Sequence, residues 1–303
     1  MISVCNLNYQ SMCDMMDNTI ETGFIDYDKT YYDLKPGEIT ICFSRDGEGK
    51  STVASQILAH HINRGKRAYL FSGELSNNKI QEWLYKQVVG ADKKRYRIVN
   101  TKYGAIRELK PEVIKALKKW HEARLFIFDT KQDNHDGSGI FDDIENAAKI
   151  GVDLIIIDNL MTAFDSNATS QHSDQSNFVQ RCKNLARNLN IHIIIIAHAN
   201  KSTGELEIGA EYGNLTKNDI SGIKNISNKA DNIWSIERIF KTNMTSQDES
   251  LQGGYDMLFT SLKDRWIGQR KTIGYYFHQS TLRFYNNNTP NTIKYDWERF
   301  LDD

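Results

Sequence analysis

Residues 42–58 read CFSRDGEGKSTVASQIL and pass from an apolar segment, through a turn with two glycines, into a helical pattern. Gly49, Lys50 and Ser51 match the last three fixed positions of the phosphate-binding pattern G-x-x-x-x-G-K-[ST], whereas Ser44 stands where its first glycine belongs. In such a loop, glycines let backbone N–H groups turn toward phosphates, the lysine reaches the β and γ phosphates, and the hydroxyl binds Mg²⁺. The stretch predicts a site for ATP or another NTP with Mg²⁺. The alternative is an ordinary glycine-rich turn that caps a helix.

The surroundings of this loop have the order that a phosphate-binding loop requires. A strand is predicted for Glu38 to Phe43, and Val53, Ile57 and Ile62 form one face of a following helix. Ser44 weakens the match to the phosphate-binding pattern more than it weakens the expected binding of phosphate and Mg²⁺. That position shapes the loop and supplies neither the lysine nor the hydroxyl. The predicted nucleotide-binding residues of the loop are Ser44, Arg45, Asp46, Gly47, Glu48, Gly49, Lys50, Ser51 and Thr52.

The composition indicates a globular α/β protein with one large core. The chain has 303 residues, of which 40% are hydrophobic and 25% are charged. Its net charge of −1 means that local basic clusters must hold any nucleic-acid partner. The cysteines at positions 5, 13, 42 and 182 have no metal-ligand spacing, and no apolar run is long enough to span a membrane. We therefore expect a cytoplasmic protein without a membrane partner.

Apolar runs alternate with helix-period stretches, which is typical of a mainly parallel sheet flanked by helices. Further strands are predicted at 67–72, 125–129, 154–158, 191–197 and 232–237, and helices at 51–63, 77–89, 111–122, 139–149 and 175–189. In the last third, YDMLFTSLKDR, KTIGYYFH and TLRFY look like short antiparallel strands that close one sheet edge. Residues 1–20 have a loose apolar pattern, and we expect a separate helix there that packs on a neighbouring subunit. Residues 21–303 then form the main domain.

Two acidic residues follow predicted strands and fit the remaining parts of an ATPase site. The run LIIIDN at 154–159 places Asp158 at the carboxyl end of a buried strand, where an aspartate that helps to hold Mg²⁺ belongs. The run YLFSGEL places Glu74 after the strand that follows the loop, where a carboxylate can polarise the water that attacks the γ-phosphate. Asp158 could instead be a solvated residue at a strand end, and Glu74 an acid favoured near a helix N-terminus.

In order along the chain, these segments resemble a known family. The stretch through GEGKST, then YLFSGEL, LIIIDNL, HIIIIAHANKS, DISGIKNISNKADNIWSIER and SLKDRWIGQRKTIGYYF is similar to the RecA-type motor domain of ring-shaped replicative helicases: DnaB, Twinkle and phage primase-helicases. The resemblance covers roughly residues 22 to 285. That family also tolerates a residue other than glycine at the first position of the loop, where Ser44 stands here.

The resemblance implies roles for further residues. His198 matches a polar residue that senses the γ-phosphate, and Lys263 and Arg265 match a pair that reaches across the subunit interface to the neighbouring nucleotide. Arginine suits this task because its planar fork stabilises charge on the transferring phosphoryl group. Arg238 and His278 match positions that flank the nucleotide base. The alternatives are a strand-end histidine without a role and a solvated face of an edge strand.

The resemblance also implies a DNA-binding loop that lines a ring channel and contacts phosphates without reading bases. Its members in NLTKNDISGIKN are Lys217, Asn218, Ser221, Gly222 and Lys224. Ile220 replaces an arginine often found in the family, so the positive charge would come from Lys217 or Lys224. MTAFDSNATSQHSDQS is a second candidate loop. The basic run from Lys93 to Arg97 is interpreted as a solvated face.

These features together predict an NTP-driven helicase motor that encircles single-stranded DNA as a homo-oligomeric ring, with a hexamer expected. The sequence before the motor contains no zinc site or acidic primase domain, so a separate primase or loader would act as a partner. We expect the protein in the bacterial cytosol, and because the resemblance includes phage proteins, the protein could be encoded by a phage. Two alternatives stay open: a RecA-like recombinase or DNA-dependent ATPase without unwinding, and a nucleotide-gated loader. The presence of Lys50, Glu74 and Arg265 together favours hydrolysis over the loader.

Overall fold

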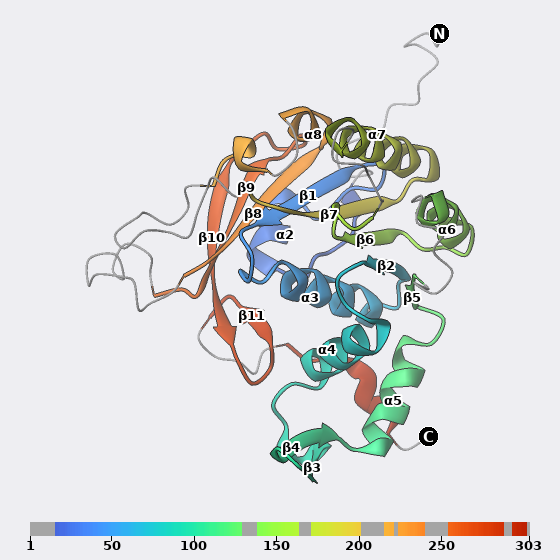
Figure 1. Ribbon diagram of the computed structural model, residues 1–303, viewed down its shortest axis with the longest axis vertical. Helices are drawn as coiled ribbons and strands as arrows, with labels where there is room; N and C mark the ends of the chain where they lie inside the picture. Colours follow the sequence, from blue (N-terminus) through green and yellow to red (C-terminus); the bar gives the residue numbers. More distant parts are fainter. Residues whose placement is uncertain are drawn as a thin grey trace.

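The computed structural model describes residues 16–128, 138–163, 171–200, 215–220, 224–239, 254–287 and 293–301. Within these ranges, nine strands form one sheet in the order β11-β10-β9-β8-β1-β7-β6-β2-β5 (Figure 1). Their bounds are β1 (Ile39–Ser44), β2 (Ala68–Ser72), β5 (Leu125–Ile127), β6 (Leu154–Asp158), β7 (His192–His198), β8 (Asn232–Arg238), β9 (Met257–Lys263), β10 (Lys271–His278) and β11 (Arg283–Tyr285).

The sheet has a parallel part and an antiparallel edge, as the sequence predicts. Strands β5, β2, β6, β7, β1 and β8 pair in parallel with their neighbours. Strands β9, β10 and β11 continue from β8 in antiparallel pairs. The central parallel strands β1, β2 and β6 are buried along their length, which fits their near-continuous apolar sequences. The predicted α/β class is therefore confirmed.

Helices cover both faces of the sheet (Figure 1). The helices are α2 (Ile25–Tyr31), α3 (Lys50–Asn63), α4 (Asn77–Val89), α5 (Pro111–His121), α6 (Ser138–Lys149), α7 (Gln171–Leu189) and α8 (Lys224–Lys229). Alternate residues of β1 face opposite layers, because successive side chains of a strand point to opposite faces. Ile39 and Ile41 pack in the cluster with α6 and α7, whereas Cys42 packs in the cluster with α2 and α3. Within the described residues, no helix combines the length and apolar character needed to cross a membrane.

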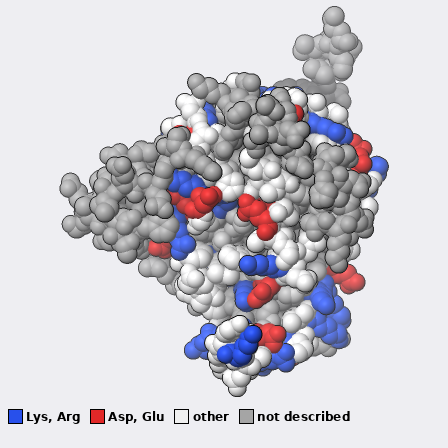
Figure 2. Space-filling view, in the orientation of Figure 1, with Lys and Arg blue, Asp and Glu red and all other residues white. Residues whose placement is uncertain are grey.

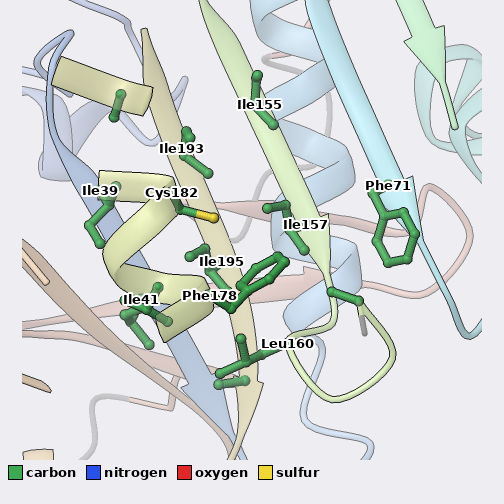
Figure 3. Close-up of a cluster of buried hydrophobic side chains, with 14 of the residues drawn as sticks. Ile39, Ile41, Phe71, Ile155, Ile157, Leu160, Phe178, Cys182, Ile193 and Ile195 are labelled. Carbon is green, nitrogen blue, oxygen red and sulfur yellow. The ribbon is translucent and has the colours of Figure 1, made fainter. Parts of the chain in front are cut away.

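The larger core lies between the sheet and helices α6 and α7. Figure 3 shows Phe178 and Cys182 of α7 lying against isoleucines of β1, β6 and β7. Ile155, Ile157 and Ile193 in this layer have no exposed surface. A separate core joins α4 and α5 to the short C-terminal helix η6 (Asp296–Phe300) and includes the buried Trp120. Because close packing fixes β1, β6 and β7 relative to one another, the residues at their ends are held in place.

Several elements differ from the sequence prediction. Helix α2 is not predicted, and α7 begins at Gln171, so residues 171–176 of the candidate DNA loop at 161–176 are helical. An additional two-stranded ribbon, β3 (Tyr96–Thr101) and β4 (Gly104–Leu109), follows the short helix η2 (Lys93–Arg95). Figure 2 shows that Lys and Arg side chains gather at this end of the molecule.

The predicted N-terminal helix falls mostly on residues 1–15, which lie outside the described residues. Ile20 exchanges two backbone hydrogen bonds with Leu34 and is buried in the cluster that contains α2 and α3. The packed domain therefore includes Ile20, one residue before the predicted boundary at 21.

Gly73 connects β2 to the segment that carries Glu74, and its backbone approaches another loop closely. Its N–H donates to Asp158 O at 2.9 Å, and a Cβ added to Gly73 would lie 2.2 Å from Thr162 Oγ1 and 2.4 Å from Thr162 Cβ. Only glycine fits this contact without movement of one of the two segments.

We predict that Gly73→Ala destabilises the protein by about 1–3 kcal/mol, because overpacking forces such a shift. The measurement is thermal or urea unfolding. Gly139→Ala in α6 is the control, since its added Cβ meets only Phe128 at an ordinary 4.0 Å. Equal stability of the two variants would contradict the close approach.

Candidate nucleotide-binding site

The loop between β1 and α3 has the backbone shape of a phosphate-binding loop. Gly47 and Gly49 have φ angles of 76° and 98°, which lie in the left-handed region that favours glycine. Helix α3 begins directly after Gly49, and Ser51 lies in its first turn. Backbone N–H groups at a helix start, together with the helix dipole, favour a bound anion. The predicted loop therefore has the expected strand–turn–helix setting.

Lys50 lies at this helix start with its ammonium turned into the loop. Its Nζ donates to Arg45 O at 2.9 Å and to Ser44 Oγ at 3.1 Å. Burial lowers the pKa of Lys50, with nearby acidic groups acting in the opposite direction. A phosphate oxygen is a stronger partner for this ammonium than neutral oxygens are, since charge-assisted hydrogen bonds are the stronger ones. Ser44 therefore shapes the loop and holds the lysine.

Ser51 and Asp158 form a pair that fits a magnesium ion. Ser51 Oγ donates to Asp158 Oδ2 at 2.8 Å, and Asp158 is 6% exposed at the carboxyl end of β6. Burial raises the pKa of Asp158, so a cation beside it would stabilise the charged carboxylate. A hydroxyl and a carboxylate are hard oxygen ligands of the kind that Mg²⁺ prefers. The residues present therefore fit the metal that the loop pattern implies.

Glu74 and His198 meet beside this pair through an asparagine that the sequence patterns did not single out. Asn159 Nδ2 donates to Glu74 Oε1 and lies 2.8 Å from His198 Nε2. His198 Nδ1 lies 2.5 Å from Asp46 Oδ1 of the phosphate-binding loop. The structure thus connects the ends of β2, β6 and β7 with the loop after β1. The signal for Asn159 was its place directly after Asp158, but nothing in the sequence shows its contact with Glu74.

One cavity of about 550 Å³ is lined by the phosphate-binding loop together with Glu74, Asp158 and His198. Its polar wall includes Asp46, Lys50, Glu74, Asp158 and His198. Gly47, Gly49, Ser51 and Thr52 also line it, whereas Ser44, Arg45 and Glu48 lie outside its lining. Between α3 and α4 the same cavity has an apolar wall that includes Leu58, Ile80 and Trp83. Its volume and its few convergent polar groups are typical of a small-molecule site.

Of the two residues predicted to flank the base, only one is among the residues that line the cavity. Arg238 lines the cavity, and its guanidinium lies 5.2 Å from the ring centre of Phe277. Phe277 and Gln279 also line the cavity, but His278 does not. His278 faces Tyr285 instead, with ring centres 6.4 Å apart. Neighbouring side chains on β10 alternate between faces, so Phe277 lines the cavity and His278 does not, and the base-flanking role of His278 stays a prediction.

Lys263 and Arg265 lie away from this cavity and gather around a buried acid. Arg265 Nε lies 3.4 Å from Asp231 Oδ1, and the Arg265 side chain is 46% exposed. Lys263 Nζ donates to the carbonyl oxygens of Ser227 and Ala230 near the end of α8. Burial, with the Arg265 charge second, lowers the pKa of Lys263 to about 8. Arg265 is therefore exposed and does not line the cavity of its own chain.

The predicted DNA-binding residues are described only in part. Lys217 and Asn218 lie in the short helix η4 (Lys217–Asp219), and both are exposed. Lys224 begins α8, whereas Ser221 and Gly222 lie outside the described residues. The basic run near Lys93 does not join this group: Arg95 pairs with Glu298 at 2.9 Å and Arg97 with Glu108 at 2.7 Å.

A buried parallel sheet with a phosphate-binding loop and acidic groups at one edge defines a P-loop nucleotide-binding protein with a RecA-like fold. The family model of the DnaB-like helicase C terminal domain matches residues 19–286, so the chain belongs to that family. It is thereby placed among the ATP-dependent DNA helicases that serve replication.

Two solved structures show the same fold. One is an ATPase domain, which superposes with a TM-score of 0.67 at 17% identity, covering 89% of this chain and 93% of that one. The other is a DnaB-like replicative helicase, described with its interactions with primase, which gives a TM-score of 0.66 at 16% identity. That match covers 88% of this chain and 61% of the helicase chain. Among curated proteins, no sequence matches this chain.

Glu48 gives a pH-dependent test of the loop. Glu48 is 4% exposed, and burial raises its pKa from the ordinary 4.5 to about 7. A raised carboxyl pKa means that ionisation is harder in the folded state, so stability is lost as the pH rises from the unfolded to the folded pKa.

We predict that Glu48→Gln is increasingly more stable than the parent between about pH 4.5 and pH 7, with a constant difference above that. Gln can still accept the Arg45 N–H that Glu48 now accepts at 3.3 Å. The measurement is the melting temperature of both proteins across this range, with the exposed Glu112→Gln as the control. A pH-independent difference would show that the charge of Glu48 is not the cause.

Proposed function

We propose that this chain is a ring-forming motor that couples hydrolysis of ATP, or another NTP, to movement along single-stranded DNA and to unwinding of a duplex. One observation carries the proposal: Lys50, Asp158, Glu74 and His198, which are far apart in the sequence, line one cavity beside the phosphate-binding loop. This set supplies phosphate binding, a metal ligand, a base and a contact to the γ-phosphate. A loader that only binds nucleotide would not need the base.

In the proposed reaction, water attacks the γ-phosphorus and a new O–P bond forms. The bond between the γ-phosphorus and the β,γ-bridging oxygen breaks, and its electron pair leaves with ADP. Glu74 takes the proton of the attacking water, and Lys50 stabilises negative charge on the β and γ phosphates. Ser51 and Asp158 would hold Mg²⁺, which supplies further positive charge to the phosphates when it is bound. Arg238 and Phe277 lie where they can flank the base.

The ring is proposed to complete each site at a subunit interface. Arg265 and Lys263 would reach the nucleotide of the neighbouring subunit, with six subunits as the expected number. Two positive groups there would stabilise the charge that spreads over the transferring phosphoryl group. Residues 1–20 would connect adjacent subunits. A separate primase or loader would act with the ring, by analogy with the neighbour described with primase, in the cytosol of a bacterium or of a phage-infected cell.

The DNA would be held by Lys217, Asn218, Ser221, Gly222 and Lys224. One contact supports a link from this segment to the nucleotide: Asn200 N donates to Asp219 O at 2.7 Å, only two residues after His198. Ala199 and Ile220 also form a backbone bridge. A shift of His198 on hydrolysis would therefore be passed to the segment that carries Lys217. Phosphate contacts of this kind carry no sequence preference.

We predict that Lys50→Ala abolishes both ATP hydrolysis and strand displacement from a forked DNA duplex, because the variant lacks the ammonium that contacts the β and γ phosphates. Lys66→Ala, at an exposed lysine just after α3, is the matched control and should keep parental activity. Steady-state phosphate release and displacement of a labelled strand are measured together. Parental hydrolysis by Lys50→Ala would overturn the nucleotide site. Hydrolysis without displacement by the parent protein would favour a DNA-dependent ATPase.

The shared site is tested by mixing two inactive variants. Arg265→Ala subunits should bind ATP but hydrolyse it on the order of a thousandfold more slowly, as expected for loss of an arginine finger. Mixed with Lys50→Ala subunits, they should regain activity at interfaces where an intact loop meets an intact arginine. Arg270→Ala, at an exposed position in the same segment, is the control and should need no partner. If mixed oligomers form but no ratio exceeds the two inactive parents, the arginine acts within its own subunit.

A further inference from the structure

Asn159 lies between Glu74, the proposed base, and His198, the proposed contact to the γ-phosphate. It is 1% exposed and follows Asp158 at the end of β6. Its side-chain amide contacts Glu74 and His198, which belong to segments 85 and 39 residues away in the sequence. A buried amide must satisfy both its donor and its acceptor atoms, so the direction of each contact can be worked out.

Backbone donors fix the orientation of this amide. Asn159 Oδ1 accepts from Met161 N at 2.8 Å and from Thr162 N at 3.2 Å. An amide rotated by half a turn would place its NH₂ group against these two N–H groups, which is unfavourable. The NH₂ group therefore lies on the side of Glu74 and His198. Its two hydrogens point toward the carboxylate of Glu74 and toward the ring of His198.

This orientation also determines where His198 carries its proton. Because Asn159 Nδ2 only donates, His198 Nε2 must accept at 2.8 Å and therefore carries no proton. The ring proton is then on Nδ1, which donates to Asp46 Oδ1 at 2.5 Å. The Nε2 atom also lies 3.2 Å from Glu74 Oε1, but without a proton it donates nothing to that oxygen. Glu74 consequently receives its hydrogen bond from Asn159.

The backbone around Asn159 holds this arrangement in place. Gly73 N donates to Asp158 O at 2.9 Å, and Leu160 N donates to Ile196 O at 2.8 Å. Both Asn159 neighbours are therefore hydrogen-bonded to the strands that lead to Glu74 and His198. A small shift of either strand end would therefore move the side-chain amide of Asn159.

We propose that Asn159 is a positioning residue that holds the carboxylate of Glu74 for the attacking water and selects the Nδ1–H tautomer of His198. This inference rests on the proposed roles of Glu74 and His198. In this proposal, the side-chain amide of Asn159 couples Glu74, the base, to His198, which contacts the γ-phosphate. A change at His198 when the γ-phosphate leaves would then reach Glu74 through Asn159.

Asn159→Asp separates this role from a structural one. Aspartate keeps an oxygen that can accept from Met161 and Thr162, so the turn is retained, but it places an anion against Glu74 and removes both donors. We expect unchanged ATP affinity and a kcat that falls about a hundredfold or more, within the range for loss of a positioned base. In this variant, Glu74 faces the new carboxylate at position 159 and the ring of His198, and the charge of Asp158 also acts on it. An added anion there makes ionisation of Glu74 harder, so the acid limb of the kcat profile should move to higher pH.

Asn78→Asp is the matched control, since Asn78 is exposed near the start of α4 and the chemical change is identical. It should keep the parental kcat and profile. Glu74→Gln is measured in parallel to separate the two hypotheses. If Glu74→Gln is inactive and Asn159→Asp keeps the parental kcat and profile, the role of Asn159 is overturned alone. If Glu74→Gln hydrolyses ATP at the parental rate, the base assignment fails and the role of Asn159 fails with it.

Discussion

Parallel pairing of β1, β7, β6 and β2 in one register is the constraint on which the rest of the structure depends. In this register, Ser44 lies opposite His198, and Ser72 lies opposite Asp158. Parallel strands present their carboxyl ends at the same edge, and ligands bind outside those ends in open α/β sheets. A slip of one residue in any pair would turn the side chains of that strand to the opposite face. Close packing on both faces of these strands opposes such a slip, so the core also sets the positions of the reactive groups.

The same edge concentrates charges that the fold alone does not favour. Burial raises the pKa of Asp158 and lowers that of Lys50, so each charged form opposes folding. A cation beside Asp158 and phosphates beside Lys50 would reverse both effects. Ligands that bind only the folded state stabilise it, and here the gain would include the relief of these buried charges. Buried charges that oppose folding are consistent with a site arranged around a ligand rather than around its own packing.

Much of the fold and part of the site could be predicted from the sequence. Helix α3 and strand β6 were accessible because a phosphate-binding pattern and an unbroken apolar run mark them. The β3–β4 ribbon was missed because it is exposed on both faces, with only Leu109 buried, and so has no regular alternation. Helix α2 was missed because it is short, although its buried Tyr27 and Tyr31 are four residues apart.

The site residues that the sequence did not reveal were missed for a different reason. Asn159 and Phe277 act through contacts with segments far away in the sequence, which no local pattern records. His278 was predicted instead of Phe277 because its position matches a base-flanking position of the family that the sequence resembles. For Lys263 and Arg265 the proposed partner belongs to another subunit, so one chain shows only their contacts with Asp231 and with the carbonyl oxygens near the end of α8.

The β3–β4 ribbon has a consequence for solubility. Among the described residues, no third strand pairs with it, so both outer edges present backbone donors and acceptors to any extended chain. Exposed Ile98, Tyr103 and Ile106 would favour such pairing. The stretch from Lys93 to Arg107 contains six basic residues and no acidic one, so two copies repel each other before their edges meet. In the proposed ring, which would bring several copies together, this repulsion would protect against aggregation, and neutralising it would leave the ribbon prone to edge-to-edge association.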